Sequence, residues 1–195
     1  MFNAGLFLQI WGGFFYLLAK LLLAFSEDKA GSKKLRISGW ISYLSGIPAW
    51  VIILAGNNDW VVAAVELGSI PSMVLGILTA WRPDNAGNKI FVTFVRFFTF
   101  FTIIAGTSYS IYYFHGITTF SQVLEILITI GFLLGSYLLA KNNTTGWLLF
   151  VLMCISMILL MVLQDKLLLA SLQGVSLIVV LTGYIKAIKR KHYKR

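Results

Sequence analysis

The sequence has few of the residues that metal sites and disulfide frameworks need. Its 195 residues include one cysteine, Cys154, and two histidines, His115 and His192. A single cysteine excludes an intramolecular disulfide framework, and the three residues are too far apart for metal-ligand spacing. The chain also has no Gly-rich phosphate loop with lysine and no Gly-x-Ser-x-Gly elbow. We therefore expect neither an enzyme nor a cofactor or metal site.

Charged residues are also scarce, at 12% of the chain, whereas 58% of the residues are hydrophobic and the mean hydropathy is +0.85. A chain of this length cannot bury that much apolar surface in a water-soluble core, so its solvent is lipid. Runs long enough to cross about 30 Å of hydrocarbon predict seven transmembrane helices in one all-α integral membrane domain. These runs cover residues 6–25, 40–55, 60–81, 90–113, 120–140, 146–163 and 167–188.

Only seven acidic residues oppose 16 basic ones, and the basic residues are unevenly placed. With seven spans, 13 basic residues fall on one side of the membrane, and Lys166 is alone on the other. The positive-inside rule then puts the C-terminus in the cytoplasm and the N-terminus outside a multi-pass protein of the inner (plasma) membrane. A basic tail at 189–195 can bind nucleic acid, but contact with anionic lipid is the simpler interpretation, so we expect no nucleic-acid partner.

An internal duplication organises the chain. Residues 34–82 align without a gap with 141–189, at an offset of 107, and pair Gly39-Trp40 with Gly146-Trp147. The polar loops 57–59 and 164–166 coincide in this alignment, and the span 90–113 has no mate. We therefore predict a first repeat at about 5–82, a linker helix at 89–113, a second repeat at 119–189 and a basic tail. Because the linker adds one crossing, the two three-helix repeats should be parallel.

Two helices that precede the aligned blocks match less well. The segment Tyr16 to Lys20 recurs as Tyr137 to Lys141, at a different offset from the rest. In the aligned blocks, Ser69 and Ser176 fall at symmetry-related positions near the predicted midplane. Duplicated helical units often enclose a solute site between them, so the pattern favours a transporter.

Carboxylates inside a membrane must be paired or face an aqueous cavity. Glu66 lies six residues into its span, about 9 Å deep. Its repeat mate Gln173 and the later Glu125 have similar predicted depths. For Gln173, a hydrogen bond to a neighbouring helix and a functional role both stay open. For Glu66 we favour function, because the sequence places no evident cation at its depth. Arg96 and Lys20 are close enough to helix ends to extend toward the headgroups.

Aromatic residues suggest two roles. Trp40, Trp81 and Trp147 fall at cytoplasmic helix ends and Trp60 at an external one, which is typical of an interfacial belt. Trp50 is deeper, and with Tyr43 it can flank a flat heterocycle. Together with a nearby Glu66 or Glu125, such walls would suit a permanently charged ring, since cation–π attraction is worth about 2 kcal/mol when desolvated.

Pro48 and Pro71 lie within the second and third spans. Each removes a backbone hydrogen bond, so we predict a kink or hinge at both positions. Gly131 and Gly135 have the spacing that allows close helix approach.

The chain resembles the PnuC vitamin transporters, which share a three-plus-one-plus-three plan with the SWEET sugar carriers. The likeness covers residues 137–191: a Leu-Leu-Ala-Lys helix end, Gly146-Trp147 opening the sixth helix, and Gln173 to Gly183-Tyr184 before a basic tail. The stretch from Glu66 to Gly76, followed by Trp81, is similar too. Phe150 and Cys154 stand where the family typically shows a tryptophan and a polar residue. The resemblance implies a nicotinamide riboside or thiamine type of substrate, facilitated diffusion sustained by cytoplasmic phosphorylation, and a homotrimer.

We therefore expect a transporter for a small vitamin or nucleoside-like solute, with a site between the two repeats. The alternative is a membrane scaffold or assembly protein without a cavity. A water-accessible pocket touching Trp50, Glu66 and Gln173 would favour transport, and a closed core would favour the scaffold. The candidate substrate-binding residues are Tyr43, Trp50, Glu66, Ser69, Glu125, Trp147, Phe150, Gln173 and Ser176.

Overall fold

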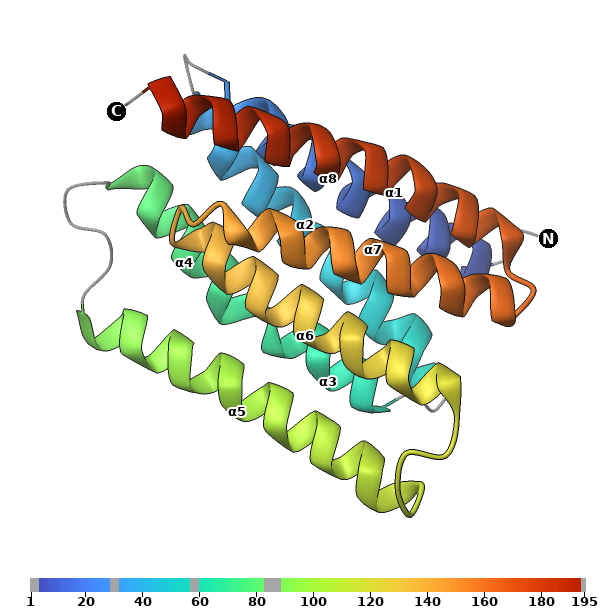
Figure 1. Ribbon diagram of the computed structural model, residues 1–195. Coiled ribbons are helices and arrows are strands. Elements are labelled where there is room, and N and C mark those ends of the chain that lie inside the picture. Colours follow the sequence, from blue (N-terminus) through green and yellow to red (C-terminus); the bar gives the residue numbers. More distant parts are fainter. Residues whose placement is uncertain (1–3, 29–31, 57–59, 83–88, 194–195) are drawn as a thin grey trace.

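The protein is an all-α bundle of membrane-length helices (Figure 1). The computed structural model describes residues 4–28, 32–56, 60–82 and 89–193, and within these ranges it contains helices and no strands. The helices are α1 (Ala4–Ser26), α2 (Lys33–Gly56), α3 (Trp60–Gly68), α4 (Ile70–Trp81), α5 (Lys89–Tyr113), α6 (Phe120–Ala140), α7 (Thr145–Leu163) and α8 (Leu167–Tyr193). Since α3 and α4 together form one span, the described residues contain seven candidate membrane spans, as the sequence predicts.

Two helices extend beyond their predicted spans. Helix α2 begins at Lys33 rather than at 40, and α8 continues to Tyr193, so residues 189–193 of the predicted tail are helical. Hydropathy marks where lipid begins and not where a helix begins. Basic residues in the last turn of α8, Arg190 and Lys191, also interact favourably with the helix dipole.

The third span is interrupted at Ser69, two residues before Pro71. Pro71 has no N–H to donate to the carbonyl of Leu67. The Ser69 hydroxyl instead donates to the Glu66 carbonyl at 2.6 Å, and the Ser69 N–H donates to the same oxygen at 3.2 Å. The predicted kink at Pro71 is thus present as a helix break at Ser69, three residues after Glu66. Helix α2, in contrast, is continuous through Pro48. Whether either proline acts as a hinge stays a prediction.

Helix α6 is central and α5 is peripheral. Twelve residues of α6 are buried, whereas the buried residues described for α5 are Val95, Thr99 and Ser110. In Figure 1, α5 lies at the side of the bundle opposite α8, and the start of α1 and the end of α8 lie at opposite ends. Helices α6 and α7 approach closely, because Gly131 and Gly135 face the backbone oxygens of Leu149 and Gly146. The predicted close approach at these two glycines is therefore confirmed.

The packing pairs of the two halves correspond. Helix α1 packs on α2, as α6 packs on α7. Helix α2 packs on α3 and α4, as α7 packs on α8. Between the halves, α1 packs on α8, as α6 packs on α4. At equivalent positions, Trp40 lies against Gly76 and Trp147 lies against Gly183. These contacts are compatible with a repeat at an offset of 107. Superposition of the complete repeats stays a prediction, and the loop 57–59 lies outside the described residues.

The contacts of Gly39 and Gly146 also relate α1 to α6. Gly39 faces the Ala19 carbonyl and Leu23, and Gly146 faces the Gly135 carbonyl and Leu139. Both α6 residues follow their α1 counterparts by 116 positions. Packing thus favours Phe132, and not Tyr137, as the counterpart of Tyr16.

Candidate functional site

Four aromatic rings meet where the first three spans, α1 to α4, touch the last three, α6 to α8; we call these two groups of helices the first and second triplets. Tyr16 of α1 and Tyr43 of α2 come from the first triplet, with ring centroids 5.1 Å apart. Phe132 of α6 and Phe150 of α7 come from the second, with centroids 6.5 Å apart. Tyr16 stacks on Phe132 at 6.1 Å, and Tyr43 meets Phe150 edge-on at 6.1 Å. We call these four residues the ring cluster. Tyr43 and Phe150 are fully buried, so the ring cluster closes the interface at this level.

Polar side chains surround the ring cluster. The Tyr16 hydroxyl donates a hydrogen bond to Oε2 of Glu66. One turn along α1, the Lys20 ammonium is 3.4 Å from Oε1 of Gln173 and 3.9 Å from Sγ of Cys154. Lys20 lies one helical turn from Tyr16, which binds Glu66. We call Tyr16, Lys20, Glu66, Cys154 and Gln173 the polar cluster; it joins α1 and α3 to α7 and α8.

The polar cluster lies deep in the bundle. Tyr16 and Cys154 are near the middle of α1 and α7, respectively. Two predicted site residues beside it have buried polar atoms without a hydrogen-bond partner, the Tyr43 hydroxyl and Nε1 of Trp50. The Trp50 ring is 6.0 Å from that of Tyr16, and its Nε1 faces Gly12 of α1. An unsatisfied buried polar group is costly, so these two atoms are candidates for contact with a ligand.

The structure corrects the interpretation of Lys20. Its side chain is 2% exposed and points into the bundle, so it does not extend to the headgroups. Lys20 points inward because it contacts Gln173 and Cys154 there. Lys20 is also the cation near Glu66 that the sequence did not reveal. Arg96, in contrast, is exposed, as a lipid-facing side chain should be.

Two of the predicted belt tryptophans are also not at the lipid interface. Trp40 and Trp147 are 0% and 1% exposed, because each fills the space beside a glycine of the following span. Trp81 is 60% exposed, which suits the belt. The Trp60 side chain lies outside the described residues.

Trp147 belongs to a second buried polar group, at the end of the bundle where α8 ends. Its Nε1 donates to Oε1 of Glu27 at 3.4 Å. Glu27 also pairs with Arg36 at 3.6 Å and with Arg190 at 2.8 Å. Arg36 donates to the Leu139 carbonyl at 2.7 Å. We call Glu27, Arg36, Trp147 and Arg190 the ionic cluster. The structure places Trp147 there and not in the polar cluster.

The other predicted site residues are more scattered. Ser69 and Ser176 are buried, at 0% and 2% exposure. Glu125 lies on α6 seven residues before Phe132, about 10 Å further toward the start of that helix. Tyr43, Trp50, Glu66, Phe150 and Gln173 are therefore the predicted residues that the fold brings to the two central clusters.

No protein-family model, curated protein or solved structure matches this chain. The resemblance to PnuC transporters therefore stays an expectation from sequence motifs, and a proposed function rests on the residues of the site.

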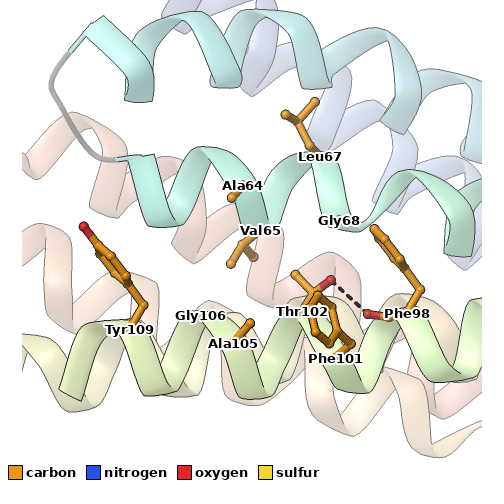
Figure 2. Close-up of a pocket in the computed structure, with 10 residues that line it drawn as sticks. All are labelled: Ala64, Val65, Leu67, Gly68, Phe98, Phe101, Thr102, Ala105, Gly106 and Tyr109. Carbon is orange, nitrogen blue, oxygen red and sulfur yellow. Dashed lines mark hydrogen bonds between the residues drawn. The ribbon is translucent and has the colours of Figure 1, made fainter. Parts of the chain in front are cut away.

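Neither of the two best-formed cavities in the described part of the chain touches Trp50, Glu66 or Gln173. The larger, of about 650 Å³, lies between α3 and α5, where Figure 2 shows Phe98 and Tyr109 of α5 reaching toward α3. Its lining is almost entirely apolar. The Thr102 hydroxyl donates its hydrogen bond within α5, to the Phe98 carbonyl. Such a groove suits hydrocarbon chains rather than a polar solute. The smaller, of about 150 Å³, lies between α1 and α8.

Sequence reasoning missed Tyr16 and Lys20 as site residues. The sequence did contain a signal for them. Tyr16 and Lys20 are four residues apart and therefore on one helix face, and both are polar residues in an otherwise apolar run. Cys154 had no signal of its own, since a buried cysteine usually behaves as a small apolar residue.

Proposed function

We propose that this membrane protein is a transporter for a small vitamin or nucleoside-like solute, with its site at the polar cluster and the ring cluster. The observation that supports this proposal most strongly is that Glu66, Lys20, Gln173 and the unpartnered Tyr43 hydroxyl come together within apolar spans. Ionisable groups inside a membrane are costly, and they commonly mark substrate pathways.

The position of the polar groups supports the same proposal. They come from helices of both triplets, so relative movement of the triplets would open and close the site. The ring cluster then acts as the closed contact that must part, at Tyr43 and Phe150. The break between α3 and α4 at Ser69, three residues after Glu66, offers a place where the first triplet can bend. Facilitated diffusion, with the product trapped by cytoplasmic phosphorylation, is the mode that the PnuC resemblance implies.

One observation favours a second candidate, a membrane scaffold or assembly protein. The two described cavities both miss Trp50, Glu66 and Gln173, and the helices are in closed contact at Tyr43 and Phe150. A transporter in an occluded state would share this feature, whereas a scaffold would keep it permanently.

Binding and uptake separate the two candidates. Purified protein is titrated with nicotinamide riboside, thiamine and uncharged nucleosides while thermal unfolding is followed in detergent, and uptake of any binder is measured in proteoliposomes. A ligand at 100 times its Kd should add about 2.7 kcal/mol to the free energy of unfolding. Gln173→Leu should lower the affinity, and Ser171→Ala, an exposed site on the same helix, should leave it unchanged. Absence of both a thermal shift and uptake across the panel would favour the scaffold.

A further inference from the structure

The polar cluster has an internal balance of charge. Glu66 is its one acidic side chain among the described residues, and it is already bound by the Tyr16 hydroxyl. Lys20 supplies the opposite charge, one helical turn along α1 from the Tyr16 that binds Glu66. A cationic solute would therefore meet a carboxylate that is already partnered, together with a buried ammonium of the same sign as itself. Juxtaposed like charges in a desolvated site oppose binding strongly.

The side-chain groups at this site that have unused hydrogen-bonding capacity are mainly donors. The Lys20 ammonium has three N–H bonds, and its contacts are long, at 3.4 Å to the Gln173 amide oxygen and 3.9 Å to the Cys154 sulfur. Nε1 of Trp50 can only donate, and it has no acceptor. The Tyr43 hydroxyl has neither a donor nor an acceptor.

Aromatic surface lies beside these donors. The Tyr16 ring contacts the rings of Tyr43 at 5.1 Å and Trp50 at 6.0 Å, and Lys20 follows Tyr16 by one helical turn. A ligand that inserts between these rings and reaches Lys20 would satisfy buried donors and keep the site neutral.

From this arrangement we infer that the solute is an uncharged, flat ring compound carrying hydrogen-bond acceptors, such as carbonyl or hydroxyl oxygens, and that Lys20 binds those acceptors. This inference rests on the proposed transport function, and it replaces the cationic ring favoured by the sequence with a neutral one. Glu66 then holds Tyr16 and balances Lys20 rather than attracting the solute.

A matched pair of ligands tests the inference. Nicotinamide riboside carries a permanent positive charge on its ring, whereas its reduced dihydro form has the same carboxamide and hydroxyl groups without that charge. Binding of both to the wild-type protein is measured by calorimetry in detergent. The neutral form should bind at least about tenfold more tightly. Lys20→Met should weaken binding of the neutral form by about tenfold or more and improve binding of the cation. Lys141→Met, at an exposed lysine at the end of α6, should change neither affinity.

The outcomes are distinguishable. Tighter binding of the cation by the wild-type protein overturns the inference and leaves the transport proposal intact. Equal loss of both ligands in a Lys20→Met protein that still unfolds cooperatively overturns the role of Lys20. Failure of both forms, thiamine and the uncharged nucleosides to bind any folded variant overturns the transport proposal itself. The wild-type comparison needs no substitution, so a misfolded variant does not remove the test.

Discussion

A carboxylate in the middle of an apolar bundle needs hydrogen bonds to remain there, and Glu66 receives one from Tyr16. Tyr16→Phe removes the phenol and keeps the ring contacts with Tyr43 and Phe132. It should lower the free energy of unfolding by about 1–3 kcal/mol, because the carboxylate loses a buried donor. Thermal unfolding in detergent measures the change. Tyr112→Phe is the matched control, since Tyr112 is 80% exposed; an equal loss in both variants would show that the Tyr16 hydrogen bond contributes nothing specific.

The sequence located Glu66, Gln173, Tyr43 and Trp50 as embedded polar or aromatic residues, and the fold brings all four near one another. It did not reveal which of them have partners. Position along a span gives depth, but the direction in which a side chain points depends on how each helix is rotated about its axis. Lys20 illustrates this limit, because its depth was also compatible with a lipid-facing position.

The same limit applies to whole helices. The sequence predicted their number and approximate positions well, because hydropathy and length determine both. It assigned Trp40 and Trp147 to the lipid interface by depth alone, whereas both pack inward against a glycine of the next span. The missing information was the rotation of α2 and α7, which the packing against α4 and α8 determines.

The tryptophan–glycine contacts predict how strongly the helix pairs depend on them. A Cβ at Gly76 would overlap the Trp40 ring, and one at Gly183 would come within 2.7 Å of the Trp147 ring. Gly76→Ala and Gly183→Ala should therefore each destabilise the protein by about 1–3 kcal/mol through overpacking. Gly174→Ala is the control on α8, because no atom lies within 4 Å of the added carbon. Thermal unfolding of the three variants measures their stability. If all three change in stability equally, helix propensity and not overpacking against the tryptophan rings determines the effect.

At the scale of the whole molecule, the ionic cluster ties the two triplets together at one end of the bundle. Glu27 at the end of α1 joins Arg36 of α2 to Arg190 of α8, and its side chain is only 4% exposed. Glu27→Gln leaves buried guanidinium groups without their counter-ion, so it should cost about 3 kcal/mol of stability. The neighbouring Asp28→Asn breaks an exposed pair with Lys186 and should cost about 0–1 kcal/mol. Comparable losses of thermal stability in the two variants would contradict a special role for the ionic cluster.

The orientation of the bundle follows from the distribution of its basic residues. Glu27, at the end of α1, contacts Arg190, near the end of α8. Arg36, near the start of α2, contacts the Leu139 carbonyl, near the end of α6. These four helix termini therefore lie at one end of the molecule. That end carries most of the cations, and the α7–α8 turn near Gln164 is at the other. Translocation of so many basic residues is disfavoured, so the basic end should face the cytoplasm. A fluorescent reporter that folds only in the cytoplasm should be active after Arg195 and inactive when inserted after Gln164. An exported phosphatase should show the reverse. Phosphatase activity at the C-terminal position would show that the orientation is inverted and would place the ionic cluster at the external, and not the cytoplasmic, end of the proposed solute path.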